Sequence, residues 1–254
     1  MKTDILIISP TRMEITPLLK LAQNQSEIIN KSGRVLIDAM YMQKKFKILI
    51  TEPGIVNTAQ ALTEEIIQNR PAIVIQTGIA GIFKNTGLKI GDIAVAESEQ
   101  YIHAGIETCV PYRNFNLDPL PFDLISGSSP TRKGIFPVDL GRSHLCFKIL
   151  QNYFAMKKIQ VGRGLFITVS TITGSDSTAE DLFSIFSPCM EAMEGAAAAH
   201  VAALYKIPFI EIRAGSNYVG QRNKSKWNIP LAAERASLAV AALIKRAPEI
   251  VSES

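Results

Sequence analysis

Residues 191–217 constrain the fold of this 254-residue chain more than any other stretch. Small residues follow one another over 195–203, a composition that lets a helix lie close against a sheet, and alanine is the strongest helix former. Residues 206–208, Lys-Ile-Pro, end that helix. The apolar run over 208–215 that follows is long enough for a buried strand and too short for a helix. The stretch therefore predicts a helix, a turn and a strand.

Four polar residues of this stretch carry its chemistry. Side chains alternate along a strand, so Glu211 and Arg213 share one face and could pair there. Asn217 comes at the carboxyl end of that strand, where open α/β sheets bind ligands. Glu194 stands at the helix start and has two interpretations: a carboxylate stabilised by the helix dipole, or an acceptor for ligand hydroxyls such as those of ribose.

Further apolar runs and helical periods predict the other elements. Strands are predicted at residues 4–9, 35–42, 46–51, 72–76, 93–96 and 161–172, and helices at 11–22, 57–68, 143–153, 178–183 and 229–244. The segment Thr77-Gly78-Ile79-Ala80-Gly81 is interpreted as a glycine-rich turn after a strand, where backbone passes close to a ligand. Residues 105–142 lack a steady period and predict a long irregular excursion. The alternation predicts one α/β domain over residues 1–254.

Glu14 also has two interpretations. Thr11 and Glu14 have the T-x-x-E spacing of a capping box, which explains the glutamate as a cap of its own helix. Glu14 also follows the first predicted strand directly. The alternative is that its carboxylate faces a ligand cleft at the mouth of that strand.

Composition limits the class of protein. Apolar residues make up 47% of the chain and charged residues 20%, as in an ordinary enzyme, and the net charge of +4 is dispersed. We therefore expect neither nucleic acid nor a membrane as partner. The isolated Cys109, Cys146 and Cys189 predict no disulfide framework, and neither cysteines nor histidines have metal-ligand spacing. Without a signal peptide or a membrane-length apolar stretch, the expected location is cytoplasmic.

Six short motifs, spread over nearly the whole chain, resemble in their order those of the nucleoside phosphorylase/nucleosidase superfamily. They are Glu14-Ile15-Thr16, Pro53-Gly54-Ile55-Val56-Asn57, Thr77-Gly78-Ile79-Ala80-Gly81, Ile90-Gly91-Asp92, Met193-Glu194-Gly195-Ala196-Ala197 and Ile212-Arg213-Ala214-Gly215-Ser216-Asn217. The resemblance implies a mixed central β-sheet flanked by helices, a purine nucleoside as substrate, no cofactor and no metal. It also implies a homo-oligomer, expected to be a dimer.

Within that superfamily the chain is most similar to the futalosine hydrolases, nucleosidases that release hypoxanthine from futalosine in menaquinone biosynthesis. Residues 168–174, 191–200 and 211–222 with Trp227 carry this narrower resemblance. The methylthioadenosine/adenosylhomocysteine nucleosidases usually have Glu and Asp where this chain has Ala192 and Asn217. An Asn amide can donate hydrogen bonds to a 6-oxo group and N7, which favours hypoxanthine over adenine.

The resemblance also implies roles for individual residues. Glu14 would be the general base on water, and Asn217 would address the purine. Met193 and Glu194 would hold the ribose, and Arg213 would order the neighbouring carboxylates. Contacts are further expected from the backbone of Ile172 and Thr173 to the purine and from Ile79 to the sugar. The tail carboxylate of futalosine could meet Arg222, Lys224 or Lys226.

Three alternatives remain open from the sequence. A purine nucleoside phosphorylase would use phosphate in place of water; Arg12 favours it, whereas the carboxylate of Glu14 would repel the anion. A methylthioadenosine/adenosylhomocysteine nucleosidase would cleave an adenine nucleoside. A non-catalytic nucleoside-binding module could use the same fold without chemistry.

Overall fold

The computed structural model describes residues 5–107, 115, 117–220 and 223–252. Its strands are β1 (Ile5–Ser9), β2 (Gln23–Ile29), β3 (Val35–Tyr41), β4 (Lys44–Ile50), β5 (Ile73–Ile82), β6 (Ile93–Tyr101), β7 (Ile135–Phe136), β8 (Val161–Thr168), β9 (Met190–Ala192) and β10 (Phe209–Tyr218). Its α-helices are α1 (Arg12–Leu21), α2 (Ile55–Gln68), α3 (Leu140–Phe154), α4 (Asp176–Phe186), α5 (Gly195–Leu204), α6 (Ile229–Lys245) and α7 (Ala247–Val251). Short 3-10 turns are η1 (Lys84–Thr86), η2 (Ser129–Lys133), η3 (Ala155–Lys157) and η4 (Lys224–Lys226).

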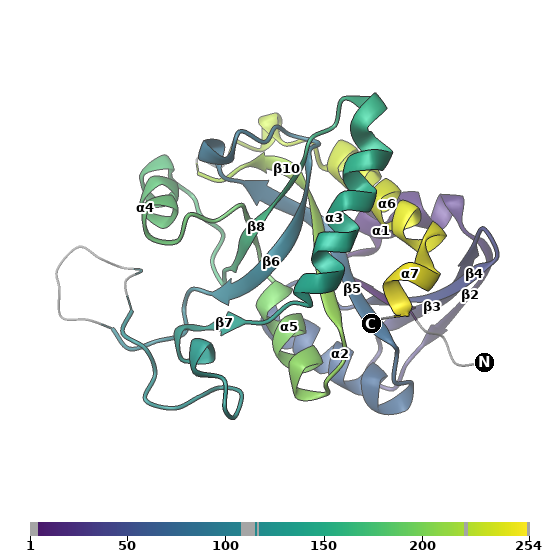
Figure 1. Ribbon diagram of the computed structural model, residues 1–254, viewed down its shortest axis with the longest axis horizontal. Helices are drawn as coiled ribbons and strands as arrows, with labels where there is room; N and C mark the ends of the chain where they lie inside the picture. Colours follow the sequence, from purple (N-terminus) through teal and green to yellow (C-terminus); the bar gives the residue numbers. More distant parts are fainter. Residues whose placement is uncertain (1–4, 108–114, 116, 221–222, 253–254) are drawn as a thin grey trace.

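These strands form one mixed sheet with helices on both faces, which confirms the predicted α/β fold (Figure 1). Successive residues of a buried strand point to opposite faces, so both faces of a central strand must be apolar. In β5, Ile75 packs into the cluster shared with α1, α3 and α6, and Val74 packs into the cluster shared with α2 and α5. The continuous apolar runs of the sequence follow from this double burial.

Part of the sheet closes on itself. β10 pairs in parallel with β5 and antiparallel with β6. β6 pairs with β8, β8 with β9, and β9 with β5, so these five strands form a ring. β1, β4, β3 and β2 extend the sheet outward from β5. The ring brings the carboxyl ends of β5 and β10 beside the short strand β9.

Two expectations about strand ends were wrong. The segment 77–81 is no turn, because it forms the second half of β5, whose backbone pairs there with β10 and β9. Glycines weaken a strand when isolated, but here two paired neighbours stabilise the extended backbone. β8 ends at Thr168 instead of continuing to Ile172, whereas Asn217, the last residue but one of β10, lies at the carboxyl end of its strand as expected.

Two strands gave no signal in the sequence. β2 is exposed along its whole length and polar at its first five positions, and it pairs with β3 at the outer edge of the sheet. β9 has only three residues, too few for a period to be recognised. The hairpin of β3 and β4 has the expected antiparallel pairing, and Met42 and Gln43 at its tip have positive φ angles.

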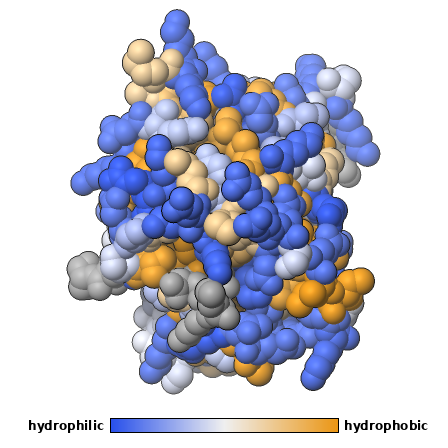
Figure 2. Space-filling view, turned by 90° about the vertical axis from the view of Figure 1, so that its right-hand side faces the viewer, coloured by the Kyte–Doolittle hydropathy of each residue, from blue (hydrophilic) through white to orange (hydrophobic). Residues whose placement is uncertain are grey.

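The described surface is mostly hydrophilic on the face seen in Figure 2, with apolar groups scattered among polar ones. Of the helices in the described ranges, none combines the length and apolar character needed to cross a membrane. Cys146 and Cys189 are buried free thiols, and Cys109 lies outside the described residues.

The described part of the excursion over 105–142 is irregular but attached to the sheet. η2 leads into β7, which pairs with β6. Gly134 joins the two elements with a φ of 68°, and its carbonyl accepts a hydrogen bond from the Tyr101 N–H at 2.8 Å. A Cβ on Gly134 would overlap the Tyr101 carbonyl oxygen, so glycine is required there for both its φ angle and its size.

Substitution of Gly134 tests this attachment. Gly127→Ala is the matched control, because Gly127 also has a positive φ, 77°, but open space around it. The control should cost about 1–2 kcal/mol of unfolding free energy for its left-handed backbone. Gly134→Ala should cost about 1–3 kcal/mol more, because the methyl overpacks the strand. Urea denaturation measures both, and equal losses would contradict the close packing of Gly134 on β6.

Candidate active site

A cavity of about 180 Å³ opens where β1, β5, β9 and β10 reach their carboxyl ends. Most of its polar lining comes from loops and strand ends far apart in the sequence. Its lining residues are Pro10, Glu14, Pro53, Ile79, Ala80, Gly81, Val169, Ile172, Glu191, Ala192, Met193, Glu194, Arg213, Ser216, Asn217 and Trp227. Ligands of open α/β sheets bind at this edge.

Glu14 is held from two sides at the floor of this cavity. Its backbone N–H donates to the Thr11 hydroxyl at 3.3 Å, as in a helix cap. Its side chain does not complete the capping box, however, because Oε1 accepts from the Thr11 hydroxyl at 2.8 Å and Oε2 from the Ile79 N–H at 2.8 Å. Glu14 is therefore fixed to β5 as well as to its own helix, with its carboxylate at the cavity wall.

Burial changes the acidity of Glu14. Its side chain is only 5% exposed, and desolvation raises its pKa above the ordinary carboxyl value of 4.5. The positive charge of Arg213 and the bonds from Ile79 and Thr11 oppose that rise without cancelling it. A carboxylate with a raised pKa is a stronger proton acceptor, which suits a general base.

Glu194 joins the starts of two helices. It is the residue before α5, and its Oε1 accepts from the backbone N–H of Gly54, the residue before α2, at 3.1 Å. Its Oε2 accepts from the Arg213 guanidinium at 3.1 Å. Glu194 is 4% exposed and lines the cavity, so it is both the helix-start acid and a carboxylate that faces the site.

Arg213 is a cation with almost no contact to solvent. The guanidinium donates from Nε to Glu211 at 2.7 Å, from Nη1 to the Ile79 carbonyl at 3.3 Å and from Nη2 to Glu194. Burial disfavours its charge, but the negative charges of Glu211, Glu194 and Glu14 outweigh this, so its pKa is raised. The predicted Glu211–Arg213 pair is present, and Arg213 also lines the cavity.

Two polar side chains lie on either side of Gly81. In the sheet register Gly81 pairs with Asn217 on β10 and with Glu191 on β9. Oδ1 of Asn217 accepts from the Ser216 hydroxyl at 2.7 Å, and its Nδ2 donates to the Tyr218 carbonyl at 3.0 Å. A Cβ on Gly81 would lie 2.8 Å from Val219, so glycine leaves this end of the cavity open.

Glu191 is the cavity residue that sequence reasoning missed. It is 7% exposed, and desolvation raises its pKa. Thr173 does not line the cavity; its backbone N–H and hydroxyl donate to the two Glu191 oxygens at 3.1 and 2.5 Å. The only sequence signal was its position, three residues before Glu194.

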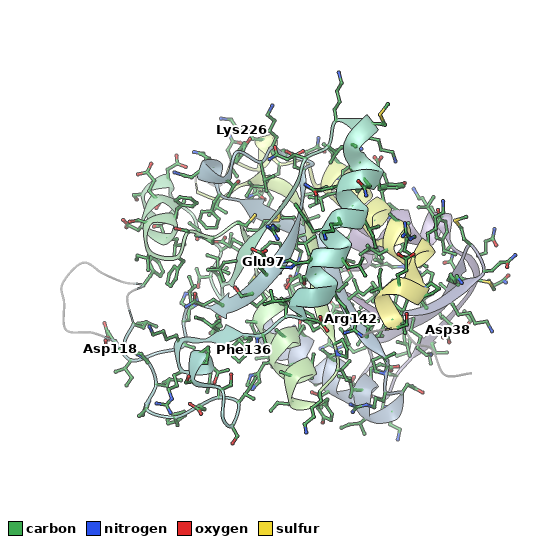
Figure 3. All side chains as sticks on the ribbon, in the orientation of Figure 1. Asp38, Glu97, Asp118, Phe136, Arg142 and Lys226 are labelled. Carbon is green, nitrogen blue, oxygen red and sulfur yellow. The ribbon has the colours of Figure 1, made fainter. Side chains whose placement is uncertain are left out.

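Most of the predicted site residues lie at one cavity. Seven of them line the one cavity: Glu14, Ile79, Ile172, Met193, Glu194, Arg213 and Asn217. Lys226, exposed at the surface in Figure 3, lines a neighbouring cavity of about 160 Å³ that shares Asn217 and Trp227 with the first. Lys224 is exposed and lines neither of these two cavities, and Arg222 lies outside the described residues. In the described ranges, no cluster of His, Cys, Asp or Glu is arranged to hold a metal ion.

Comparison with known proteins gives the family. The phosphorylase superfamily model matches residues 4–245. The chain is 27% identical to a 5'-methylthioadenosine/S-adenosylhomocysteine nucleosidase from Bacillus licheniformis, over 95% of this chain and 98% of that protein. It is 31% identical to a futalosine hydrolase from Acidothermus cellulolyticus, over 68% of this chain and 64% of that protein.

Solved structures show the same fold. The 5'-methylthioadenosine/S-adenosylhomocysteine nucleosidase from Neisseria meningitidis, in complex with methylthio-immucillin-A, has a TM-score of 0.79 at 21% identity, over 97% of this chain and 100% of that one. The futalosine hydrolase of Helicobacter pylori has a TM-score of 0.78 at 21% identity, over 96% and 98%. Because the family model spans nearly the whole sequence, the chain belongs to the phosphorylase superfamily.

Proposed function

We propose that this chain is a nucleosidase that hydrolyses the N-glycosidic bond of futalosine, releasing hypoxanthine and dehypoxanthine futalosine for menaquinone biosynthesis. The observation that carries the proposal is the meeting of Glu14, Glu194 and Asn217 in one cavity. These are the three groups that such a reaction needs: one for water, one for the sugar and one for the base.

Glu14 would activate the water. The oxygen of the water attacks the anomeric carbon as the bond to the purine breaks, and its proton passes to Glu14. The bonding electron pair leaves with the purine. A buried carboxylate with a raised pKa, held by Thr11 and Ile79, is both oriented and basic enough for this step.

Glu194 would hold the ribose. Its carboxylate accepts from the Gly54 N–H, the Met193 N–H and Arg213, yet two carboxylate oxygens have about four acceptor sites, so one on Oε1 can still receive a ribose hydroxyl. Met193 lies beside it in the lining and would pack against the sugar, with Ile79 opposite. The negative charge of Glu194 also favours the cationic character that the sugar develops in the transition state.

Asn217 and Glu191 would read the base together. The Tyr218 carbonyl, which can only accept, fixes the amide of Asn217 so that Nδ2 is the donor end, and an amide nitrogen has a second N–H besides the one bound to Tyr218. That N–H suits O6 or N7 of hypoxanthine. A 6-oxopurine carries a hydrogen at N1, which a carboxylate such as Glu191 accepts, whereas adenine presents a lone pair there. Both residues therefore favour a 6-oxopurine.

The described site fits phosphate poorly. Among the described residues Arg213 is the only cation of the cavity lining, and three of its five N–H groups already donate to protein acceptors. Arg12, which favoured a phosphorylase, pairs with Glu27 at 2.7 Å on the surface. An incoming phosphate would instead meet the carboxylates of Glu14 and Glu194, which repel it.

The second candidate function is hydrolysis of 5'-methylthioadenosine or S-adenosylhomocysteine. It is favoured by the names of relatives such as the Bacillus licheniformis protein, which matches nearly the whole chain. The side chains at the purine end of the cavity favour futalosine. A 6-amino group needs an acceptor, whereas the Asn217 amide, held by the Tyr218 carbonyl, has a second N–H to donate.

Two further cavities bear on the proposed homo-oligomer and on the binding of the futalosine tail. An apolar cavity of about 390 Å³ between α2 and α5 includes Val56, which is 76% exposed, and a second copy could cover it. The tail of futalosine would extend past Trp227 toward Lys226, which could meet its carboxylate. Lys84 in the same cavity pairs with Asp176 at 3.1 Å.

One assay tests the proposed function. The purified chain is incubated with futalosine, inosine and methylthioadenosine, with and without phosphate, and the released base and sugar are identified. We expect hypoxanthine from futalosine without any need for phosphate. Adenine from methylthioadenosine alone would establish the second candidate, ribose phosphate would establish a phosphorylase, and binding without base release would establish a non-catalytic module.

Glu14→Gln should keep the fold and reduce kcat by about 10²- to 10⁴-fold, because an amide cannot take a proton from water. Helix α1 should remain stable, since the Gln oxygen can accept from the Ile79 N–H while its amide nitrogen donates to the Thr11 hydroxyl. Glu234→Gln, an exposed change of the same type on α6, is the control. Unchanged turnover in Glu14→Gln would remove Glu14 from the catalytic residues.

On the acid side, the pH dependence of kcat/KM should follow the ionisation of Glu14. The base must be ionised, so kcat/KM should fall as the pH drops through a value above the ordinary 4.5. The Thr11 hydroxyl stabilises the ionised form, so Thr11→Val should move this limb to higher pH, whereas Thr11→Ser should leave it in place. If the fall of kcat/KM at acid pH stays at the same pH in Thr11→Val, the titrating residue is not Glu14.

Asn217→Asp should reverse the preference for the base. A carboxylate there repels the lone pairs of O6 and N7, so kcat/KM for futalosine should fall by at least about 100-fold while the ratio of methylthioadenosine to futalosine cleavage rises. Asn228→Asp makes the same charge change at the exposed cap of α6, where Asp also caps well. Equal losses in both variants would show an effect of charge alone.

A further inference from the structure

Two more carboxyl groups lie behind Arg213, away from the cavity. Glu211 on β10 and Glu99 on β6 are both fully buried. Glu211 receives the Nε donor of Arg213 through Oε1, and Glu99 receives the Thr168 hydroxyl through Oε2 at 2.7 Å. Each carboxyl has one oxygen left, Oε2 of Glu211 and Oε1 of Glu99, and neither oxygen has another donor among the described residues.

These two remaining oxygens meet at the start of α5. A Cβ built on Gly195 would overlap both Glu99 Oε1 and Glu211 Oε2, so the two atoms lie on either side of the same glycine. The two oxygens therefore lie close together, and neither has a hydrogen-bond donor among the described residues. Two ionised carboxylates have no hydrogen to share and would repel each other strongly in a buried site. The contact therefore requires a proton on one of them.

The surroundings decide which carboxyl holds the proton. Thr168 faces the pair from β8, neutral Gln76 is the register partner of Glu211 on β5, and α5 contributes Gly195 and the Ala196 backbone. Arg213 is the one cation in contact with the pair among the described residues, and it contacts Glu211.

The remaining acids and bases of the neighbourhood face elsewhere. Glu97, on β6 with Glu99, turns to the opposite side, toward α3, where it contacts His144 and the guanidinium of Arg163 (Figure 3). Glu194 lies on the far side of Arg213. Desolvation and the negative charge of Glu211 raise the pKa of Glu99 well above its ordinary value.

We propose that Glu99 keeps a proton at neutral pH, donates it to Glu211, and so acts as a positioning residue for Arg213. Glu211, kept ionised and oriented, holds Nε of the guanidinium. The other end of the guanidinium then binds the Ile79 carbonyl and Glu194. Ile79 in turn donates to Glu14. A continuous series of contacts therefore runs from Glu99 to two carboxylates of the cavity, Glu14 and Glu194. The effect on activity rests on the proposed nucleosidase function; the proton itself does not.

Amide substitutions distinguish this arrangement from mere packing. In Glu99→Gln the amide oxygen can accept from Thr168 and the amide nitrogen can donate to Glu211, which imitates a permanently protonated Glu99. In Glu211→Gln the amide can still bond to Glu99 and Arg213, but the negative charge beside the guanidinium is gone. The two variants have the same size and the same number of hydrogen bonds, so packing alone predicts equal effects.

Activity measurements give the first test. Glu99→Gln should retain kcat/KM within about threefold of the parent, whereas Glu99→Leu and Glu211→Gln should lose at least about tenfold, since a hydrogen bond to a charged group is removed or left unpaired. If Gln at position 99 keeps the activity and Leu does not, a hydrogen-bond donor toward Glu211 is what the site requires there. Equal activities of Glu99→Gln and Glu211→Gln would overturn the proposal.

Stability against pH gives a test that needs no substrate. A carboxyl whose pKa is raised by folding contributes its stability below the unfolded value and loses it as the pH rises through the folded value. The midpoint of urea denaturation of the parent should therefore fall as the pH rises from the ordinary carboxyl value of 4.5 through the raised pKa of Glu99, and that fall should be smaller in Glu99→Gln. Identical pH dependence in the two proteins would overturn the assignment.

Infrared spectroscopy observes the proton directly in the unmodified chain. At a pH where exposed carboxyls are ionised, the spectrum should contain the carbonyl band of one protonated carboxyl, and Glu99→Gln should abolish that band. A parent spectrum without the band would overturn the proposal even if the variants failed to fold. If the band is present but the chain cleaves no nucleoside, the proposed function fails and the shared proton stands.

Discussion

The structure depends on one buried cation. Arg213 lies among carboxylates that come from three elements: Glu14 on α1, Glu194 before α5 and Glu211 on β10. An isolated charge in the interior would cost far more than a domain can supply, so each partner is needed to keep the others buried and ionised. The same arrangement places two carboxylates at the wall of the cavity, where water is scarce and their electrostatic effect is strong.

Glycines make this density of charge possible. A Cβ on Gly78 would overlap Glu14 Oε2 and lie 2.8 Å from Arg213 Nη1, and a Cβ on Gly195 would overlap the Glu99 and Glu211 oxygens. Gly81 leaves the space between Asn217 and Glu191 open. The glycine-rich segment of β5 is thus a strand whose missing side chains accommodate charged groups from its neighbours, and this explains why it does not turn.

The two ends of the cavity have different polar groups. The carboxylates beside Arg213 suit a sugar that becomes positive, and the amide and carboxyl beside Gly81 suit a purine with an oxo group. Relatives of the superfamily share the fold while their names report different nucleosides. The shared fold therefore does not distinguish these nucleosides, and we propose that the side chains beside Gly81, Asn217 above all, select the base.

The sequence by itself determined much of this protein. Apolar runs and helical periods located most strands and helices, because burial on both faces of a sheet leaves a continuous local signal. Motifs identified Glu14, Glu194 and Asn217, which the structure brings to one cavity. The tertiary structure alone decided the strand character of 77–81, the short strand β9 and the place of Glu191. It also decided the contact of Glu99 with Glu211, because side chains on strands more than a hundred residues apart leave no local pattern for their pairing.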